Sequence, residues 1–340
     1  MERGTQTLIL PTDEQITAIN NFDMATAIDE AAPSPESSSL ELSFIRKLTT
    51  EGTLRFYRNK RYDVARIGNS YGLPAGDSCP GATPFCEGCY GKSAEEWESV
   101  AAKMERNMNR LVDAGTVGKM IDVIDPAINK WEKTLKRRGA KPWHYIYRPH
   151  WNGDYFSEDY AVASAEVMKR HPKVSHWAFT RSIGWGENPV DVIPILAEVP
   201  NLALYMSVDH FNQDRAREVK AKFGDLVRIA WCGEDTVETM ELSKGEGTIC
   251  PENVGDMELM VPRRTGNDPK ELQGACPQCR HCIKGDEDVH FTTGRTRVKY
   301  QGRAFPLAVA PKVDKPATQK TSEQPKANPE DTTQETLFTI

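Results

Sequence analysis

The sequence predicts an α/β protein built on a parallel sheet, in the form of a partial (β/α) barrel of five or six strand–helix units. Four apolar runs of strand length alternate with amphipathic stretches of helix length, and this alternation is typical of βαβ units. Such units join parallel strands through right-handed crossovers. The composition agrees, because 340 residues with 39% apolar and 27% charged side chains can bury a large core.

We expect the elements in the following order. A strand precedes Cys79, and a helix begins at the capping box Ser93-Ala94-Glu95-Glu96 and runs to about Gly115. A second helix covers about 117–138, with a break at Pro126. Strands follow at 143–148, 174–180, 202–208, 226–232 and near 246–250, with helices between them at about 157–170, 189–198 and 212–223.

The composition divides the chain into four parts. Residues 1–45 are predicted to be a disordered tail, 46–240 the partial barrel, 241–306 a cysteine-rich C-terminal segment, and 307–340 a second disordered tail. The net charge of −6 lies mostly in residues 1–40, which carry seven acids and one arginine. The acidic balance of the chain therefore does not argue against a polyanionic substrate.

The chain shows neither of the usual membrane signals. No uncharged stretch approaches the ~20 residues of a spanning helix, and the first residues lack the basic and apolar regions of a secretion signal. We therefore expect a cytoplasmic protein without membrane contact. In such a compartment, eight cysteines favour metal binding or catalysis over disulfides.

Three cysteines form the most informative motif. Cys79, Cys86 and Cys89 have the spacing C-x6-C-x2-C in a segment rich in Gly and Pro. Thiolates are ligands of zinc and of iron–sulfur clusters. A [4Fe–4S] cluster held by three thiolates keeps one iron open for a small molecule, whereas a structural zinc would take a fourth ligand from elsewhere in the chain.

The segment around these cysteines, with LPA at 73–75, CPGA at 79–82 and CY at 89–90, resembles the radical S-adenosylmethionine (SAM) superfamily. Within that superfamily it is similar to a phage-encoded group with the same long first gap, whereas most members have C-x3-C-x2-C. The resemblance covers about residues 65–285 and implies a (β/α)6 barrel of the radical-SAM type.

The resemblance also implies the chemistry. Cys79, Cys86 and Cys89 would bind three irons of a [4Fe–4S] cluster, and SAM would chelate the fourth. An electron that a reductant such as flavodoxin or ferredoxin provides would cleave SAM to a 5′-deoxyadenosyl radical, which abstracts a substrate hydrogen atom.

A second set of cysteines follows the predicted barrel. Cys276, Cys279 and Cys282 have the spacing C-x2-C-x2-C, and Cys250 supplies a fourth thiolate. We favour an auxiliary [4Fe–4S] cluster, with a zinc site as the alternative. The eighth cysteine, Cys232, lies in an apolar run and is expected to be a buried, inert thiol.

Gly153 and Asp154 follow the 143–148 strand, where Gly153 permits a tight turn. They resemble in place and chemistry the Gly-Gly-Glu segment of the superfamily, which implies that Asp154 accepts a hydrogen bond from the SAM ammonium. A plain turn with a helix cap at Ser157 is the alternative. Arg181, after the next strand, would pair with a carboxylate or phosphate, or form a surface ion pair.

The last two predicted strand ends carry further candidates. The resemblance implies that Ser207 and Asp209 contact the ribose or carboxylate of SAM, and that Glu234 lies against its adenosine. The sequence identifies no residue that carries the substrate chemistry itself.

Two segments outside the predicted barrel units suggest a nucleic-acid partner. Residues 55–62 interleave basic and aromatic side chains, and Gln334–Phe338 resembles the pentapeptide that binds the bacterial sliding clamp. With the phage resemblance, they favour an isomerase that rearranges an amino-acid-modified thymine in phage DNA, a hypermodification that protects from host restriction. RNA or a small metabolite is the alternative substrate. A zinc-stabilised nucleic-acid-binding protein without catalysis is the alternative class.

Overall fold

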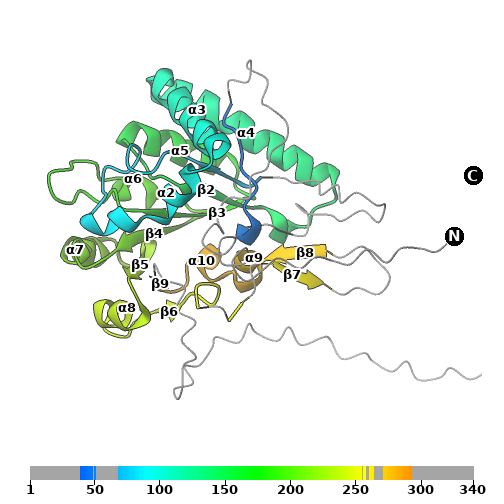
Figure 1. The fold of residues 1–340 in the computed structure, drawn as a ribbon. Helices are drawn as coiled ribbons and strands as arrows, with labels where there is room; N and C mark the ends of the chain where they lie inside the picture. Colours follow the sequence, from blue (N-terminus) through cyan, green and yellow to red (C-terminus); the bar gives the residue numbers. More distant parts are fainter. Residues whose placement is uncertain are drawn as a thin grey trace, which may run out of the picture. The chain divides into compact units, whose positions relative to one another are not determined.

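The computed structural model describes residues 39–48, 50, 68–254, 256–257, 260–263 and 271–292, all of which belong to one contact unit, residues 1–299. Its centre is a sheet of seven parallel strands in the order β1-β2-β3-β4-β5-β9-β6 (Figure 1). The predicted α/β class with a parallel sheet is confirmed.

The strands lie close to their predicted positions. Those that the sequence predicts are β1 (Ser70–Gly72), β2 (Ile146–Asn152), β3 (Ser175–Thr180), β4 (Leu202–Val208), β5 (Arg228–Gly233) and β6 (Thr248–Ile249). The largest difference is at β2, because Pro142–His144 forms a 3-10 turn, η3, before the strand begins. A further strand that we did not predict, β9 (Val289–Thr292), lies between β5 and β6.

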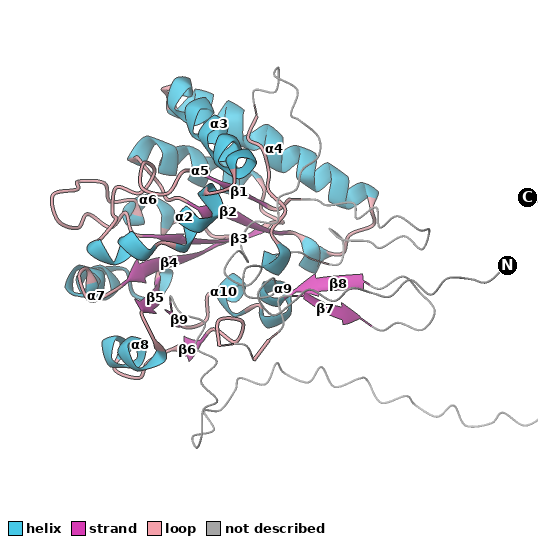
Figure 2. Ribbon diagram, viewed as in Figure 1, coloured by secondary structure: helices cyan, strands magenta, loops and turns pink. Residues whose placement is uncertain are grey.

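Helices pack on one face of this sheet and a cysteine-rich segment on the other (Figure 2). The helical face carries α4 (Val117–Arg137), α5 (Glu158–Arg170), α6 (Ile193–Leu196) and α7 (Gln213–Phe223). The opposite face, here called the inner face, carries η1 (Arg46–Leu48), α2 (Tyr90–Glu95), α9 (Ala275–Cys279) and α10 (His281–Lys284). Helix α3 (Glu98–Ala114) contributes to both cores, and the remaining elements are η2 (Pro84–Gly88), η4 (Gly224–Leu226), α8 (Thr236–Ser243) and the antiparallel pair β7 (Met260–Arg263) and β8 (Glu271–Gly274).

The predicted helix from Ser93 to Gly115 is two helices, α2 and α3. Trp97 has an extended backbone between them, with φ −91° and ψ 109°. The capping box at Ser93 is wrong because α2 already begins at Tyr90, where the Cys89 sulfur accepts a hydrogen bond from the Gly91 amide at 3.3 Å. The short α6 likewise occupies only the middle of the predicted helix 189–198.

Pro126 does not break α4, in contrast to the prediction. The proline is exposed, so the Asp122 carbonyl that loses its helical partner lies on an exposed face. Ile124, Ala127 and Ile128 are buried around it. Burial of this apolar face therefore holds the helix together through the proline.

Residues 39–45, which we assigned to a disordered tail, pack on the sheet. Leu40 is buried, and its amide donates to the Val123 carbonyl at 3.1 Å. Ser43 forms an antiparallel bridge with Ser70 beside β1. Ordered structure therefore begins before residue 46. None of the described helices is long and apolar enough to cross a bilayer.

Candidate metal centre at the carboxyl ends of the strands

The segment from Leu73 to Tyr90, here called the cysteine loop, leaves β1 and folds into consecutive tight turns. The Cys79 amide donates to the Gly76 carbonyl at 2.9 Å, and the Cys86 amide donates to the Thr83 carbonyl at 2.9 Å. The Cys89 amide then donates to the Cys86 carbonyl at 3.1 Å. These turns bring the second and third cysteines to adjacent positions at the start of α2.

Close backbone contacts hold the cysteine loop against the ends of β2 and β3. A Cβ on Gly81 would lie 1.9 Å from the Arg181 carbonyl oxygen, so only glycine fits there. Gly153 has φ +80°, and a Cβ on it would lie 2.4 Å from the Ser78 hydroxyl. The Leu73 amide donates to the Asn152 carbonyl at 2.9 Å. The three cysteines therefore lie at the carboxyl edge of the sheet.

Asp154 joins the cysteine loop to the strand ends. Its carboxylate accepts hydrogen bonds from the amides of Tyr155 and Arg181, each at 2.7 Å, and its own amide donates to Ser78 at 3.3 Å. Burial raises the pKa of Asp154 to about 6, although these hydrogen bonds act to lower it. The carboxylate thus has a structural role at this edge, and its predicted contact with SAM stays a prediction. Ser157 caps α5, as the alternative interpretation of this turn predicted.

Arg181 and Asp209 form a buried ion pair beside the cysteine loop. Asp209 is fully buried, and Thr83 also donates to its carboxylate, at 2.7 Å. The Arg181 guanidinium lies 5.7 Å from the ring centre of Phe85. Burial lowers the pKa of Arg181, but the nearby thiols of Cys232 and Cys86 and the Asp209 carboxylate raise it further than burial lowers it. The surface ion pair considered for Arg181 is therefore wrong.

Cys232, which we expected to be a buried, inert thiol, lies at the same edge. Burial raises its pKa to about 11, with smaller effects from Arg181, Asp209 and Cys86. The residue is the last but one of β5, on the inner face of the sheet. The sequence could have predicted this position. Side chains alternate between the two faces of a strand, so Cys232 lies on the same face as Ala230, which belongs to the inner-face core.

The other two candidates differ in position. Ser207 is partly buried in β4, two residues before Asp209, and so on the same face of the strand. Glu234 is exposed, and its amide donates to the Glu238 carboxylate at 2.6 Å. No contact joins the Glu234 side chain to the cysteine loop among the described residues, so the structure does not bring this residue to the site.

The soft donors of the cysteine loop are the sulfur atoms of its three cysteines. All eight cysteines are free thiols, and burial together with the Asp154 charge raises the pKa of Cys79 to about 12. A metal would therefore have to displace the thiol proton. Within the described ranges, no group of three His, Cys, Asp or Glu side chains is already arranged to hold a metal ion. Three thiolates suit an iron–sulfur cluster with one open iron, and a zinc ion would need a fourth ligand from elsewhere in the chain.

The comparisons with known proteins identify the family. Residues 42–285 match the family described as Gene product 88. The chain belongs to the Gene product 88 family. Among its relatives are the "Gene 88 protein" of Mycobacterium phage L5, 33% identical over 234 residues (67% of this chain and 87% of the relative), and that of Mycobacterium phage D29, 31% identical over 232 residues (67% and 88%). No solved structure matches the chain.

The match to the Gene product 88 family contains all eight cysteines, and so both predicted metal sets. The clamp-like segment Gln334–Phe338 lies beyond the match. This segment and the basic-aromatic residues 55–62 also lie outside the described residues. The two named relatives are bacteriophage proteins, which supports the predicted phage context.

The fold of this Gene product 88 member also brings the other four predicted ligands together. This C-terminal cysteine set comprises Cys250, Cys276, Cys279 and Cys282. Burial raises the pKa of Cys282 well above its usual value, and the other three thiols raise it further. Cys276 and Cys282, like Phe179 and Ala203, pack against the inner-face core. Cys250 follows the carboxyl end of β6, so this set also lies on the inner face of the sheet.

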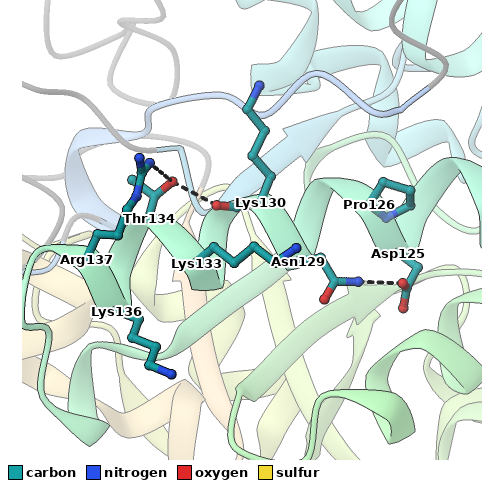
Figure 3. Close-up of a pocket in the computed structure, with 8 residues that line it drawn as sticks. All are labelled: Asp125, Pro126, Asn129, Lys130, Lys133, Thr134, Lys136 and Arg137. Carbon is teal, nitrogen blue, oxygen red and sulfur yellow. Dashed lines mark hydrogen bonds between the residues drawn. The ribbon is translucent and has the colours of Figure 1, made fainter.

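A hollow along α4 is separate from both cysteine sets (Figure 3). Four cations line it: Lys130, Lys133, Lys136 and Arg137. Within the described part of the chain none of the four forms an ion pair, and Asp125 at one end of the hollow is hydrogen-bonded to Asn129 at 2.5 Å. The hollow is thus a cationic surface on the helical face of the sheet.

Proposed function

We propose that this protein is a radical SAM enzyme with a partial (β/α) barrel, in which Cys79, Cys86 and Cys89 hold a [4Fe–4S] cluster. One observation carries the proposal: three free thiols lie in a loop that follows the first strand and docks on the carboxyl edge of a parallel sheet. In barrels of this kind, that edge is where functional groups gather. Three thiolates leave one iron for SAM.

When bound, the cluster supplies the electron that cleaves SAM to the radical which abstracts a substrate hydrogen atom. The chain's own residues shape the place for that reaction. The Arg181–Asp209 pair fixes the position of Thr83 beside Cys86, and Asp154 locks the cysteine loop to β3. Ser207 and Asp209 lie on the face of β4 that borders the loop and are the residues we assign to SAM binding.

For the substrate we propose phage DNA, with rearrangement of an amino-acid-modified thymine as the reaction. The phage relatives and the cationic hollow along α4 support a nucleic acid, because lysine and arginine side chains bind phosphates. Deleting the gene from a phage that encodes it should then change the nucleoside profile of the phage DNA. An unchanged profile would leave RNA or a small metabolite as the substrate.

Metal analysis tests the cluster. After anaerobic purification and reconstitution with iron and sulfide, we expect the Cys79/Cys86/Cys89→Ala variant to hold about four fewer irons per chain than the wild type. Cys232→Ala is the matched control, because it removes a neighbouring thiol that is not a proposed ligand. Zinc in place of iron in the wild type would instead support a zinc-stabilised nucleic-acid-binding protein without catalysis.

A further inference from the structure

The C-terminal cysteine set is assembled from two separate segments. Cys250 follows β6, and its amide donates to the His290 carbonyl of β9 at 3.1 Å, which ties this cysteine to the edge of the sheet. Cys276 and Cys279 lie in α9 and Cys282 in α10. Arg280 has φ 60° between the two helices and turns the chain there. The fold therefore adds Cys250 to three thiols that are already close in sequence.

Three of the four cysteines are partly buried against the inner-face core: Cys276 and Cys282 pack against one cluster of it, and Cys250 and Cys282 against another. Burial raises the pKa of Cys276 to about 11, where Cys279 contributes a further small increase. Burial raises the pKa of Cys250 to about 12, and Cys276 is among the groups that raise it further. The thiols of Cys250, Cys276 and Cys279 all raise the pKa of Cys282. Four protonated thiols at this position would leave the adjacent positive charge without compensation.

That charge belongs to Arg148, on the inner face of β2. Its side chain is buried, with 8% of the residue exposed, and the guanidinium lies 4.9 Å from the ring centre of Phe179. Its Nε has no hydrogen-bond partner, and no described carboxylate pairs with the guanidinium. Its charge acts on Cys276 and Cys282. A buried cation without an anion is costly, so Arg148 indicates that an anion belongs at the thiols.

Lys47 adds a second cation near the set. It acts on Cys250 and Cys276, and its ammonium is paired with the Glu252 carboxylate at 3.7 Å. A centre with four thiolates carries a net negative charge that would balance Arg148, and neutral thiols carry none.

We propose that the C-terminal cysteine set binds a second [4Fe–4S] cluster and that Arg148 is its buried counter-charge. We favour this centre over a zinc ion because Cys276, Cys279 and Cys282 form a C-x2-C-x2-C run of the ferredoxin type, whereas zinc sites usually take two closely spaced thiolates from each segment. Four thiolates saturate the four irons of this cluster, so it has no open iron. The inference stands independently of SAM chemistry at the cysteine loop.

The experiment uses the full chain with Cys79, Cys86 and Cys89 changed to Ala, so that only the second centre is present. After anaerobic reconstitution we expect about four irons and four sulfides per chain, and after reduction the electron paramagnetic resonance signal of a [4Fe–4S] cluster. Adding Cys276→Ser, Cys279→Ser and Cys282→Ser should abolish both. About one zinc per chain, or iron that persists without these cysteines, would overturn the proposal.

Arg148 is tested by a variant that needs no cysteine to be removed from the second centre. In the same background, Arg148→Met should shift the reduction potential of the cluster to a more negative value, because a nearby positive charge stabilises the reduced state. Arg148→Lys keeps the positive charge, so its reduction potential should lie close to that of the protein with Arg148. Equal potentials for Met, Lys and Arg at this position would contradict the role of counter-charge.

Discussion

Asp209 is the residue on which the contacts at the carboxyl edge depend most. It is fully buried, pairs with Arg181, and accepts hydrogen bonds from Thr83 at 2.7 Å and the Phe211 amide at 2.8 Å. Asp209→Asn keeps the shape but leaves Arg181 without its counter-ion. We expect a loss of about 3 kcal/mol in unfolding free energy, measured by urea denaturation of the metal-free chain.

Asp225→Asn provides the control for this change. Asp225 also pairs with an arginine, Arg228, at 2.6 Å, but its side chain is 88% exposed. Water and salt screen such a pair, so the variant should unfold at the same urea concentration as the wild type. Equal effects of the two substitutions would show that burial of the Arg181–Asp209 pair does not matter.

Two buried histidines should make stability depend on pH. Burial lowers the pKa of His150 and of His176 to about 3. The unfolded chain protonates each near pH 6.5 and so binds protons that the folded chain does not. Stability should therefore fall as pH falls below about 6.5, by up to about 1.4 kcal/mol per pH unit for each histidine.

His176→Phe should reduce that slope, because neither ring nitrogen of His176 has a hydrogen-bond partner within the described structure. Urea denaturation at pH 7, 6 and 5 measures the effect. His210→Gln is the control, since the His210 side chain is 47% exposed. If neither His176→Phe nor His210→Gln changed the dependence of stability on pH, buried His176 would have to become protonated in the folded protein.

At the scale of elements, the docking of the cysteine loop on β3 can be tested with two glycines. A Cβ on Gly81 would lie 1.9 Å from the Arg181 carbonyl, whereas a Cβ on Gly88 has nothing within 4 Å. Gly81→Ala must therefore displace the loop, and we expect it to lose about four irons per chain on reconstitution. Gly88→Ala, between Cys86 and Cys89, should keep them. Equal iron in both variants would show that the docking is not needed for the cluster.

Strands and helices were the features of the fold that the sequence predicted best. The strand 202–208 has the predicted bounds, because a continuous apolar run in a parallel sheet is buried on both faces. The positions at which helices break were harder to predict from the sequence. Pro126 predicted a break that burial of its neighbours overrides, and the division at Trp97 has no Gly or Pro to mark it.

For the molecule as a whole, the sequence predicted which cysteines act together but not what surrounds them. Cys79, Cys86 and Cys89 are close in sequence, so their spacing sufficed. The proximity of Cys232 to Cys86 and of Arg148 to Cys282 depends on strands meeting across the sheet. The same holds for β9, whose position between β5 and β6 depends on pairing between segments that are distant in the sequence.

Two separate groups of cysteines border the inner face of the sheet. The cysteine loop covers the carboxyl edge, where β3 and β4 end in Thr180 and Val208. In the C-terminal cysteine set, Cys276 and Cys282 pack against the inner-face core, as Phe179 and Ala203 do. We therefore propose that the first set carries the reaction and that the second holds a closed, fully ligated centre.

The most direct test of this account is the formation of 5′-deoxyadenosine from SAM. The reconstituted full chain is incubated with SAM and dithionite under anaerobic conditions, beside the Cys79/Cys86/Cys89→Ala variant and the Cys276/Cys279/Cys282→Ser variant. We predict 5′-deoxyadenosine from the wild type and none from the variant of the cysteine loop. Equal amounts of product from the wild type and the loop variant, or a wild type that binds zinc and no iron, would contradict the proposed function.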